Sequence, residues 1–219
     1  MNTKLKTESV IPQVLFTLER LMELPLFNNF RLAGGTAFAL QKGHRISNDL
    51  DLFTNQEFNS REIEFVLKKE WANQVEVSVR IFGVTAWIHY NVQGDSIKVD
   101  IIREEEPFLK PAHEIGGVRI SAFEDIAAMK MKAITSRRAR KDYIDIFFLL
   151  ETYALSEMLD LFEKRFVYYD RKDPLMGLAD IDAADSDMMP KMITPVDWPD
   201  IKRKIKSQLK EYLKSELSS

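Results

Sequence analysis

A set of glycines and aspartates in a fixed order restricts the fold of this chain more than any other feature. A short apolar lead runs into Gly34-Gly35-Thr36, then Asp49-Leu50-Asp51-Leu52 alternates polar and apolar residues, and Asp100 follows within Val99-Asp100-Ile101. Alternation with a period of two is typical of a strand with its leucines on the core face and its aspartates on the other. Like charges on one strand face repel each other unless a cation lies between them. If the strand of Asp100 lies beside the first strand, three carboxylates converge.

Three convergent carboxylates predict a site for Mg²⁺ or Mn²⁺. Magnesium takes oxygen ligands and keeps substrate phosphates among them, and two such ions can assist both the attacking oxygen and the leaving pyrophosphate. We therefore expect Asp49, Asp51 and Asp100 to be catalytic residues and metal ligands, with a nucleoside triphosphate (NTP) as substrate. Gly34 and Gly35 would let backbone N–H groups approach its phosphates at a helix N-terminus. Each element alone has an ordinary explanation, such as an exposed strand face, a turn or a buried aspartate, but the ordered combination favours catalysis.

Hydrophobic periodicity predicts an α+β protein with a mixed β-sheet flanked by helices, followed by a helical C-terminal half. The expected domains are an α/β core at 1–120 and a helical region at 121–219 packed on it. In the first half, helices are predicted at 11–24, 37–41 and 60–71, strands at 48–53, 74–82, 84–92, 96–103 and 118–120, and a tight turn at Gln93-Gly94-Asp95. In the second half, helices are predicted at 122–153 with a break near 136–140, at 154–167 and at 198–217, with an irregular loop at 170–197.

The composition limits the compartment and the partners. The 219 residues carry a net charge of −3, so any contact with nucleic acid must come from a local basic surface. The chain has no cysteine, which excludes disulfides and thiolate metal sites. No stretch approaches the ~18 uninterrupted apolar residues of a membrane span. We therefore expect a cytoplasmic protein with no membrane partner.

Two stretches resemble a known family. Gly34-Gly35-Thr36-Ala37-x-Ala39-Leu40-x-x-Gly43-His44-Arg45-x-Ser47-x-Asp49-Leu50-Asp51-Leu52-Phe53 resembles the AbiEii/AbiGii toxins of abortive-infection toxin–antitoxin systems, within the polymerase-β-like nucleotidyltransferase superfamily. The second stretch comprises Lys130-Met131-Lys132-Ala133, Ser136-Arg137 and Lys141-Asp142-Tyr143-x-Asp145, and it is similar to the helical motifs of the same family. Residues 154–219 carry no motif of this pattern.

The resemblance implies a nucleotide-binding set beyond the aspartates. Its members are Gly34, Gly35, Thr36, Arg45, Lys130, Arg137 and Lys141. Lys130, Arg137 and Lys141 would share one face if their helix were continuous. Lys141 could instead only pair with Asp145. Asp142 and Asp145 are candidates for a general base toward the acceptor or for groups that orient basic side chains, and the two interpretations have equal weight.

The expected function is NTP-dependent transfer of a nucleotide by the toxin of a type IV system. The resemblance implies a cognate antitoxin as partner, GTP as substrate in some members, and RNA, especially tRNA, as acceptor. Two alternatives stay open: a small-molecule nucleotidyltransferase of the aminoglycoside type, and a catalytically silent module that keeps the fold to bind a partner. An Asp-x-Asp glycosyltransferase is disfavoured by the Gly-Gly-Thr loop. On the last helix, Lys202, Lys206, Lys210 and Lys214 form a basic stripe that is either a solvated face or an RNA contact.

Overall fold

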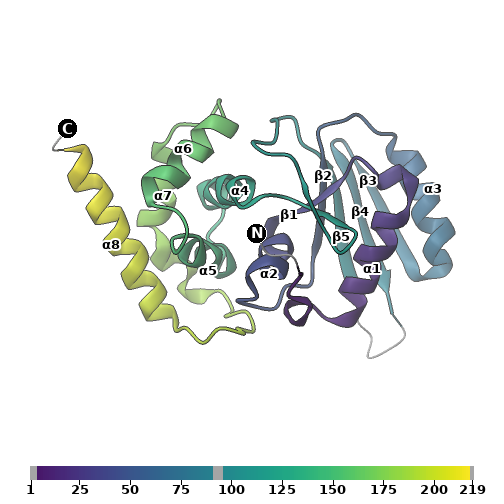
Figure 1. Cartoon of the computed structure of the whole chain (residues 1–219), viewed down its shortest axis with the longest axis horizontal. Coiled ribbons are helices and arrows are strands. Elements are labelled where there is room, and N and C mark those ends of the chain that lie inside the picture. Colours follow the sequence, from purple (N-terminus) through teal and green to yellow (C-terminus); the bar gives the residue numbers. More distant parts are fainter. Residues whose placement is uncertain (1–3, 91–95, 218–219) are drawn as a thin grey trace. The chain divides into compact units, whose positions relative to one another are not determined.

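The computed structural model describes residues 4–90 and 96–217 and divides into two compact units (Figure 1). The first unit comprises the described residues up to Pro107 together with Pro111–Ser121. The second comprises Phe108–Lys110 and the described residues from Ala122 onward. The two are described in turn.

The first unit is a mixed sheet with helices. Its helices are α1 (Pro12–Glu23), α2 (Gly34–Lys42) and α3 (Ser60–Trp71), with 3₁₀ turns at Thr7–Ser9, Pro25–Phe27 and Ala72–Gln74. Its strands are β1 (Arg31–Ala33), β2 (Leu50–Thr54), β3 (Val75–Arg80), β4 (Gly83–His89), β5 (Ser96–Arg103), β6 (His113–Ile115) and β7 (Val118–Ile120). Within the described residues the seven strands have the order β3-β4-β5-β2-β1-β7-β6. This arrangement confirms the predicted α+β class.

The centre of the sheet is built from alternating residues. Leu50 and Leu52 of β2 are fully buried, and so are Val99 and Ile101 of the neighbouring β5. The residues between them therefore point to the opposite face. Helix α3 packs against β3 and β4, where Figure 1 shows it beside the sheet, and α2 contacts β1 and β2. Burial of every second residue explains why the strand pattern could be recognised in the sequence.

The other predicted segments of this unit were confirmed in part. Helix α3 and strands β5 and β7 have the predicted bounds. Strands β1 and β6 were missed although the equally short β7 was predicted, because β1 and β6 are strands only through their pairing with β2 and β7. The predicted turn Gln93-Gly94-Asp95 lies outside the described residues.

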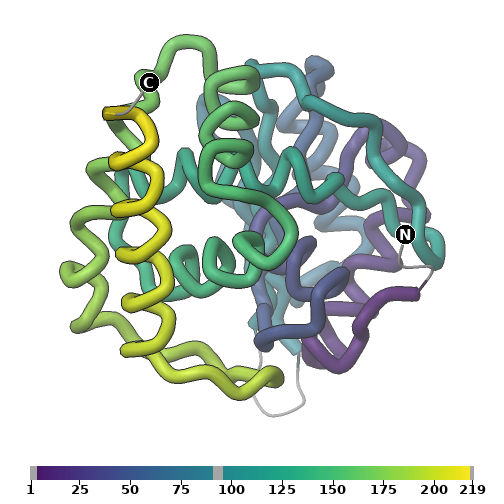
Figure 2. Tube along the Cα trace, turned by 60° about the vertical axis from the view of Figure 1, so that its left-hand side comes forward, coloured from purple at the N-terminus to yellow at the C-terminus, as the bar shows by residue number. Residues whose placement is uncertain are grey.

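The helices and strands assigned in the described part of the second unit are all helices. It contains α4 (Phe123–Ser136), α5 (Arg140–Leu149), α6 (Leu155–Arg165), α7 (Lys172–Ala179), a 3₁₀ helix at Ile181–Ser186, and α8 (Trp198–Glu216). Figure 2 shows α8 as one long helix, and it packs on α5, α6 and α7. The break expected near 136–140 is confirmed, since α4 ends at Ser136 and α5 begins at Arg140.

The prediction of an irregular loop at 170–197 was wrong for residues 172–186, which contain α7 and a 3₁₀ helix, whereas the described residues 187–197 contain no helix. Gly177 of α7 lies so close to α4 that a Cβ atom there would be 2.4 Å from the Ile134 carbonyl oxygen. The Tyr143 hydroxyl donates to the Gly177 carbonyl oxygen at 2.8 Å. Tertiary contacts at a glycine therefore stabilise a helix that its own sequence disfavours.

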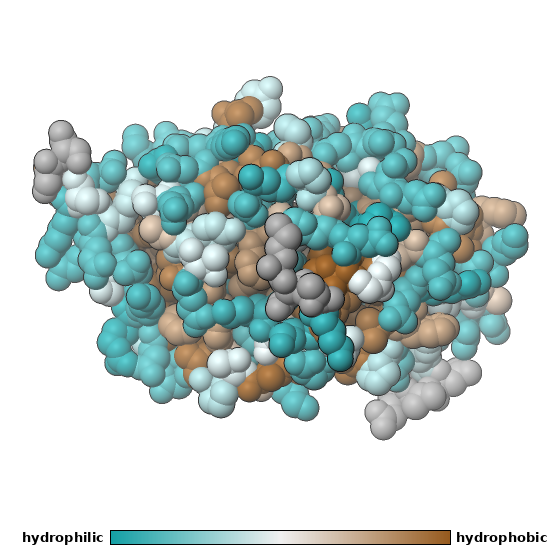
Figure 3. Space-filling view, viewed as in Figure 1, coloured by the Kyte–Doolittle hydropathy of each residue, from teal (hydrophilic) through white to brown (hydrophobic). Residues whose placement is uncertain are grey.

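Helix α8 buries one face and exposes a basic one. Ile201, Ile205 and Leu209 are buried, and Figure 3 shows hydrophilic side chains over this helix on the left of the view. The aspartates of the 3₁₀ segment, which lies within the predicted loop, pair with the lysines of α8. These pairs are Lys202 with Asp182 and Asp185, and Lys206 with Asp182. Part of the basic stripe thus stabilises the second unit.

The segment Phe108–Lys110 joins the second unit through a buried carboxylate. Asp125 of α4 accepts hydrogen bonds from the backbone N–H groups of Leu109 at 2.8 Å and Lys110 at 3.1 Å. The guanidinium of Arg165, itself buried, lies 3.0 Å from the same carboxylate. A buried charge that is paired and hydrogen-bonded in this way fixes the path of the chain. Across residues 4–90 and 96–217, no helix has both the length and the apolar character needed to cross a membrane.

Candidate active site

Two of the predicted catalytic aspartates are direct neighbours across the sheet. Strands β2 and β5 are parallel, and their register pairs Asp51 with Asp100. Asp100 is paired on its other side with Thr85 of β4, and Asp51 with Ala33 of β1. Directly opposite residues point to the same face of a sheet. Asp51 and Asp100 therefore project side by side from the face opposite the buried leucines.

Asp100 has two polar partners on the sheet. The Thr85 hydroxyl donates to its Oδ1 at 2.6 Å, and the Lys98 ammonium pairs with its Oδ2. Lys98 lies two residues before Asp100 on the same strand and so on the same face. The ammonium compensates the charge of one carboxylate beside another.

Asp51 lies against the glycine that begins α2. Gly34 has a φ of +68°, and a Cβ atom at this position would be 2.7 Å from Asp51 Oδ2. Glycine is required here for two reasons. The backbone at this position is left-handed, and the Asp51 carboxylate occupies the space that a side chain would need. The N-cap residue of α2, Ala33, makes no side-chain hydrogen bond to the start of the helix. The first N–H groups of the helix, at Gly34, Gly35 and Thr36, are therefore suited to an anion.

Thr36 and Asp49 are linked through the backbone. The Thr36 hydroxyl is buried, donates to the Asp49 carbonyl oxygen and lies 2.8 Å from the Ser47 hydroxyl. These contacts hold the segment that leads into β2. Asp49 itself is exposed and precedes the strand. The side chain of Thr36 thus positions Asp49, and its hydroxyl hydrogen is engaged in this hydrogen bond.

The donor chemistry of this face fits a divalent cation. Nowhere in the described part of the chain do three or more histidine, aspartate or glutamate side chains already form a group that could hold a metal ion. Asp51 and Asp100 nevertheless offer two adjacent carboxylates, and magnesium is commonly held by one or two carboxylates together with substrate phosphates. The fit therefore depends on phosphate oxygens as further ligands, and on the release of Asp100 Oδ2 by Lys98.

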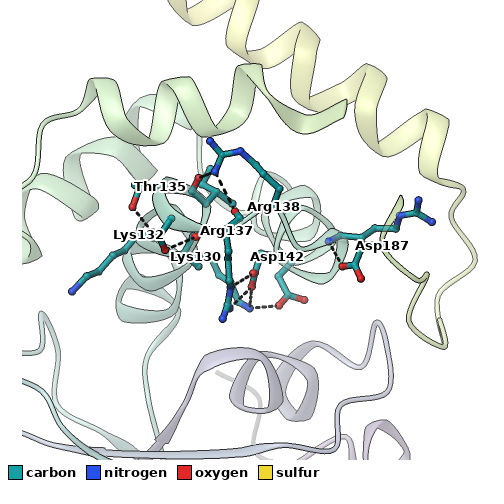
Figure 4. A network of polar contacts seen from close by, with 12 residues as sticks. Lys130, Lys132, Thr135, Arg137, Arg138, Asp142 and Asp187 are labelled. Carbon is teal, nitrogen blue, oxygen red and sulfur yellow. Dashed lines mark hydrogen bonds and ion pairs between the residues drawn. The ribbon is translucent and has the colours of Figure 1, made fainter. Parts of the chain in front are cut away.

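The second unit has a buried cluster of charges (Figure 4). Lys130 of α4 lies 2.8 Å from Asp142 Oδ1 and 2.6 Å from Asp145 Oδ2, and all three side chains are at most 5% exposed. Arg137 donates from Nε to Asp142 Oδ2 at 2.7 Å and from its Nη2 to Oδ1 at 3.1 Å. Burial alone would raise the pKa of Asp142, but Lys130 and Arg137 outweigh it and lower the pKa below its ordinary value. The contacts of Asp142 and Asp145 are those of groups that orient basic side chains.

The basic residues of the predicted nucleotide-binding set differ in exposure. Because α4 ends at Ser136 and Arg137 has an extended backbone, the helix is not continuous, and Lys130, Arg137 and Lys141 do not share one helical face. Lys130 is buried, whereas Lys141 and the Arg137 side chain are exposed. Arg45 is buried and donates to the Ile46 carbonyl oxygen at 3.1 Å.

Sequence reasoning missed both side-chain partners of Asp100. Lys98 could have been found, because its position two residues earlier in the strand places it on the same face. Thr85 could not, because its pairing with Asp100 depends on the register between β4 and β5.

Comparisons with known proteins identify a family and a relative of this chain. The model of the family described as nucleotidyl transferase AbiEii toxin, type IV TA system, matches residues 17–215 and so includes most of the helical unit. An uncharacterized protein of Aquifex aeolicus is 30% identical over 208 residues, covering 90% of this chain and 95% of the relative.

Two solved structures share the fold. A Helicobacter pylori protein assigned as a nucleotidyltransferase superposes with a TM-score of 0.63 at 20% identity, covering 93% of this chain and 96% of that one. MenT4, a nucleotidyltransferase toxin of Mycobacterium tuberculosis, superposes with a TM-score of 0.52 at 12% identity, covering 90% of this chain and 82% of that one.

Proposed function

This chain belongs to the AbiEii family of nucleotidyltransferase toxins of type IV toxin–antitoxin systems, and from that premise we propose that it transfers a nucleotide from an NTP to an acceptor hydroxyl. The observation that carries this proposal is the register of Asp51 and Asp100 on parallel strands, with the start of α2 at Gly34 lying against Asp51. Two adjacent carboxylates beside a helix N-terminus match a substrate that carries both phosphates and a cation.

The proposed chemistry divides between the two aspartates and the helix. Asp51 and Asp100, joined by Asp49 as the substrate binds, would hold Mg²⁺ or Mn²⁺, and the metal would supply positive charge at the triphosphate. The backbone N–H groups of Gly34 and Gly35 bind phosphate oxygens. Asp100 takes the proton of the acceptor hydroxyl, whose oxygen forms a bond to the α-phosphorus. The bond from this phosphorus to the bridging oxygen breaks, and pyrophosphate leaves.

The remaining proposed phosphate-binding cations are Arg137 and Lys141, which are exposed on the second unit. A positive charge offsets the charge that develops on pyrophosphate. Lys130 and Arg45 act from buried positions by ordering the residues around them. Asp142 and Asp145 hold Lys130 and Arg137, and Asp100 serves as base.

The acceptor and the partner are proposed from the family. RNA, with tRNA foremost, is the proposed acceptor, GTP is a candidate donor, and an antitoxin protein is the proposed partner. The two adjacent carboxylates of Asp51 and Asp100 give no support to the alternative of a catalytically silent binding module, because such a module would not need them.

A transfer assay tests this function. The protein is incubated with each α-³²P-labelled NTP, Mg²⁺ and total bacterial RNA, and the label that enters RNA, protein or small molecules is measured. We expect labelled RNA with wild type and none with Asp51→Asn. Glu76→Gln, which removes an exposed carboxylate from β3 of the same sheet, is the matched control and should retain activity. Equal labelling by wild type and Asp51→Asn would refute the proposal.

A further inference from the structure

A cavity opens beside Asp100 on the hairpin side of the sheet. Its volume is about 490 Å³, within the range of small-molecule sites, and most of its lining is apolar. The walls come from Ile81, Phe82, Thr85 and Ile102 together with Asp100. A group bound in this cavity therefore lies next to the carboxylate that the proposed function assigns as base.

The tip of the β3–β4 hairpin has an unusual composition. Arg80 pairs with Gly83, so the loop between the strands consists of Ile81 and Phe82. Two-residue hairpin loops favour asparagine, aspartate and glycine, which tolerate a positive φ. Ile81 and Phe82 are 91% and 64% exposed. Large apolar side chains that bury so little contribute little to folding, so their presence at this tip points to binding.

The hairpin tip is held in place against β5. The Phe82 carbonyl oxygen accepts a hydrogen bond from the Arg103 N–H at 3.1 Å. Gly83 approaches β5 so closely that a Cβ atom there would be 2.2 Å from the Ile101 carbonyl oxygen. The exposed ring of Phe82 is thus carried on a backbone fixed relative to Asp100, and a fixed platform binds at a lower entropic cost than a loose one.

A cation accompanies the aromatic ring. Arg80 also lines the cavity and is exposed. Throughout the described ranges 4–90 and 96–217 its guanidinium has no hydrogen-bond or ion-pair partner. Guanidinium groups bind phosphates in a bidentate manner. The tip therefore offers an aromatic ring, a phosphate-binding cation and a neighbouring carboxylate within one cavity.

We infer that this cavity binds the terminal nucleoside of a polynucleotide acceptor, with its base against Phe82, the adjoining phosphate at Arg80 and the reacting hydroxyl toward Asp100. The inference rests on the proposed function, and it assigns the acceptor end of that reaction to the β3–β4 hairpin. Stacking on an aromatic ring tolerates any base, so the cavity selects a single-stranded end rather than a sequence.

Steady-state kinetics test the pocket with Phe82→Ala and a matched control. Phe65 of α3 is 68% exposed and lies outside the cavity, so Phe65→Ala removes an equally exposed ring. Loss of one stacking contact is expected to raise the KM for total bacterial RNA about tenfold. The KM for NTP should not change. Phe65→Ala should match wild type, and Phe82→Trp should keep a low KM for RNA. Equal KM values for RNA in Phe82→Ala and wild type would overturn the inference.

A binding assay separates this inference from the proposed function. Fluorescence anisotropy measures binding of a short dye-labelled single-stranded oligoribonucleotide without any transfer. We expect about tenfold weaker binding for Phe82→Ala than for Phe65→Ala, and weaker binding for Arg80→Gln. Absence of transfer in wild type with this binding difference intact would refute the proposed function alone. Transfer of label to protein instead of RNA, or equal oligonucleotide binding by all variants, would overturn the acceptor pocket and leave transferase activity standing.

Discussion

Replacement of Gly34 by alanine tests the link between α2 and Asp51. Gly34 has a φ of +68°, and a left-handed backbone costs a residue with a side chain about 1–2 kcal/mol. The narrower unfolded ensemble of alanine returns about 0.4–1 kcal/mol, so a net loss of about 1 kcal/mol is expected from the backbone. The new Cβ would also lie 2.7 Å from Asp51 Oδ2 and must displace that carboxylate. Rotation of a side-chain end away from its rotamer costs about 0.5–1.5 kcal/mol more.

Gly116 provides the matched control. It has a φ of +59°, and nothing lies within 4 Å of the position of its Cβ among the described residues. Gly116→Ala therefore carries the backbone cost without touching a carboxylate. A loss of about 1 kcal/mol lowers the Tm of a chain of this size by about 2–4 °C. Both variants should remain folded, with Gly34→Ala somewhat less stable.

The assay compares Tm with and without Mn²⁺ and GTP. A ligand that binds only the folded state raises Tm, so wild type and Gly116→Ala should both gain stability on addition. Gly34→Ala should gain none, and it should lose nucleotide transfer, because its Asp51 carboxylate is displaced. A Gly34→Ala variant that is stabilised as much as Gly116→Ala would show that Asp51 is not a ligand, and the reasoning would fail.

Four further predictions concern charges. Asp142→Asn should lower the free energy of unfolding in urea by about 3 kcal/mol, the lower end for a broken buried pair, because Lys130 keeps its 2.6 Å contact with Asp145. Since the pKa of Asp142 is lowered, its stabilising effect is fully present above the ordinary pKa of 3.8 and is lost as pH falls through the lowered pKa. A urea series from pH 6 to pH 3 that shows the same loss of stability in wild type and Asp142→Asn would contradict this. Lys98→Ala leaves Asp100 beside another carboxylate without its ammonium, so the Tm gain on adding Mn²⁺ should exceed that of wild type, and a smaller gain would mean that Lys98 assists the metal. Lys141→Ala should raise the KM for NTP with Tm unchanged, whereas unchanged kinetics would assign Lys141 to a surface ion pair.

Much of the fold could be predicted because its main signals are local. The alternation of Leu50 and Leu52 with aspartates identified β2, and the same logic identified β5 around Val99. Strand β1 has three residues, and α7 depends on the approach of Gly177 to the Ile134 carbonyl oxygen. Neither feature has a period, and both are fixed by contacts between segments distant in the chain.

The candidate site, like the fold, could be predicted only in part. Residue types and order predicted Asp51 and Asp100, and the register between parallel strands placed them side by side. The burial of Lys130 could not be predicted, because it depends on pairing with two aspartates of another helix. The contact of Gly34 with Asp51 likewise depends on the pairing of β1 with β2.

The central claim is that Asp51 and Asp100 together hold the cation that accompanies the NTP. A crystal of the protein grown with Mn²⁺ and a non-hydrolysable GTP analogue, measured for anomalous scattering, tests this most directly. The account predicts an anomalous peak in contact with both carboxylates and with phosphate oxygens, with the Lys98 ammonium moved off Asp100. An analogue bound elsewhere, or a peak that touches neither carboxylate while Lys98 keeps its contact with Asp100, would contradict it.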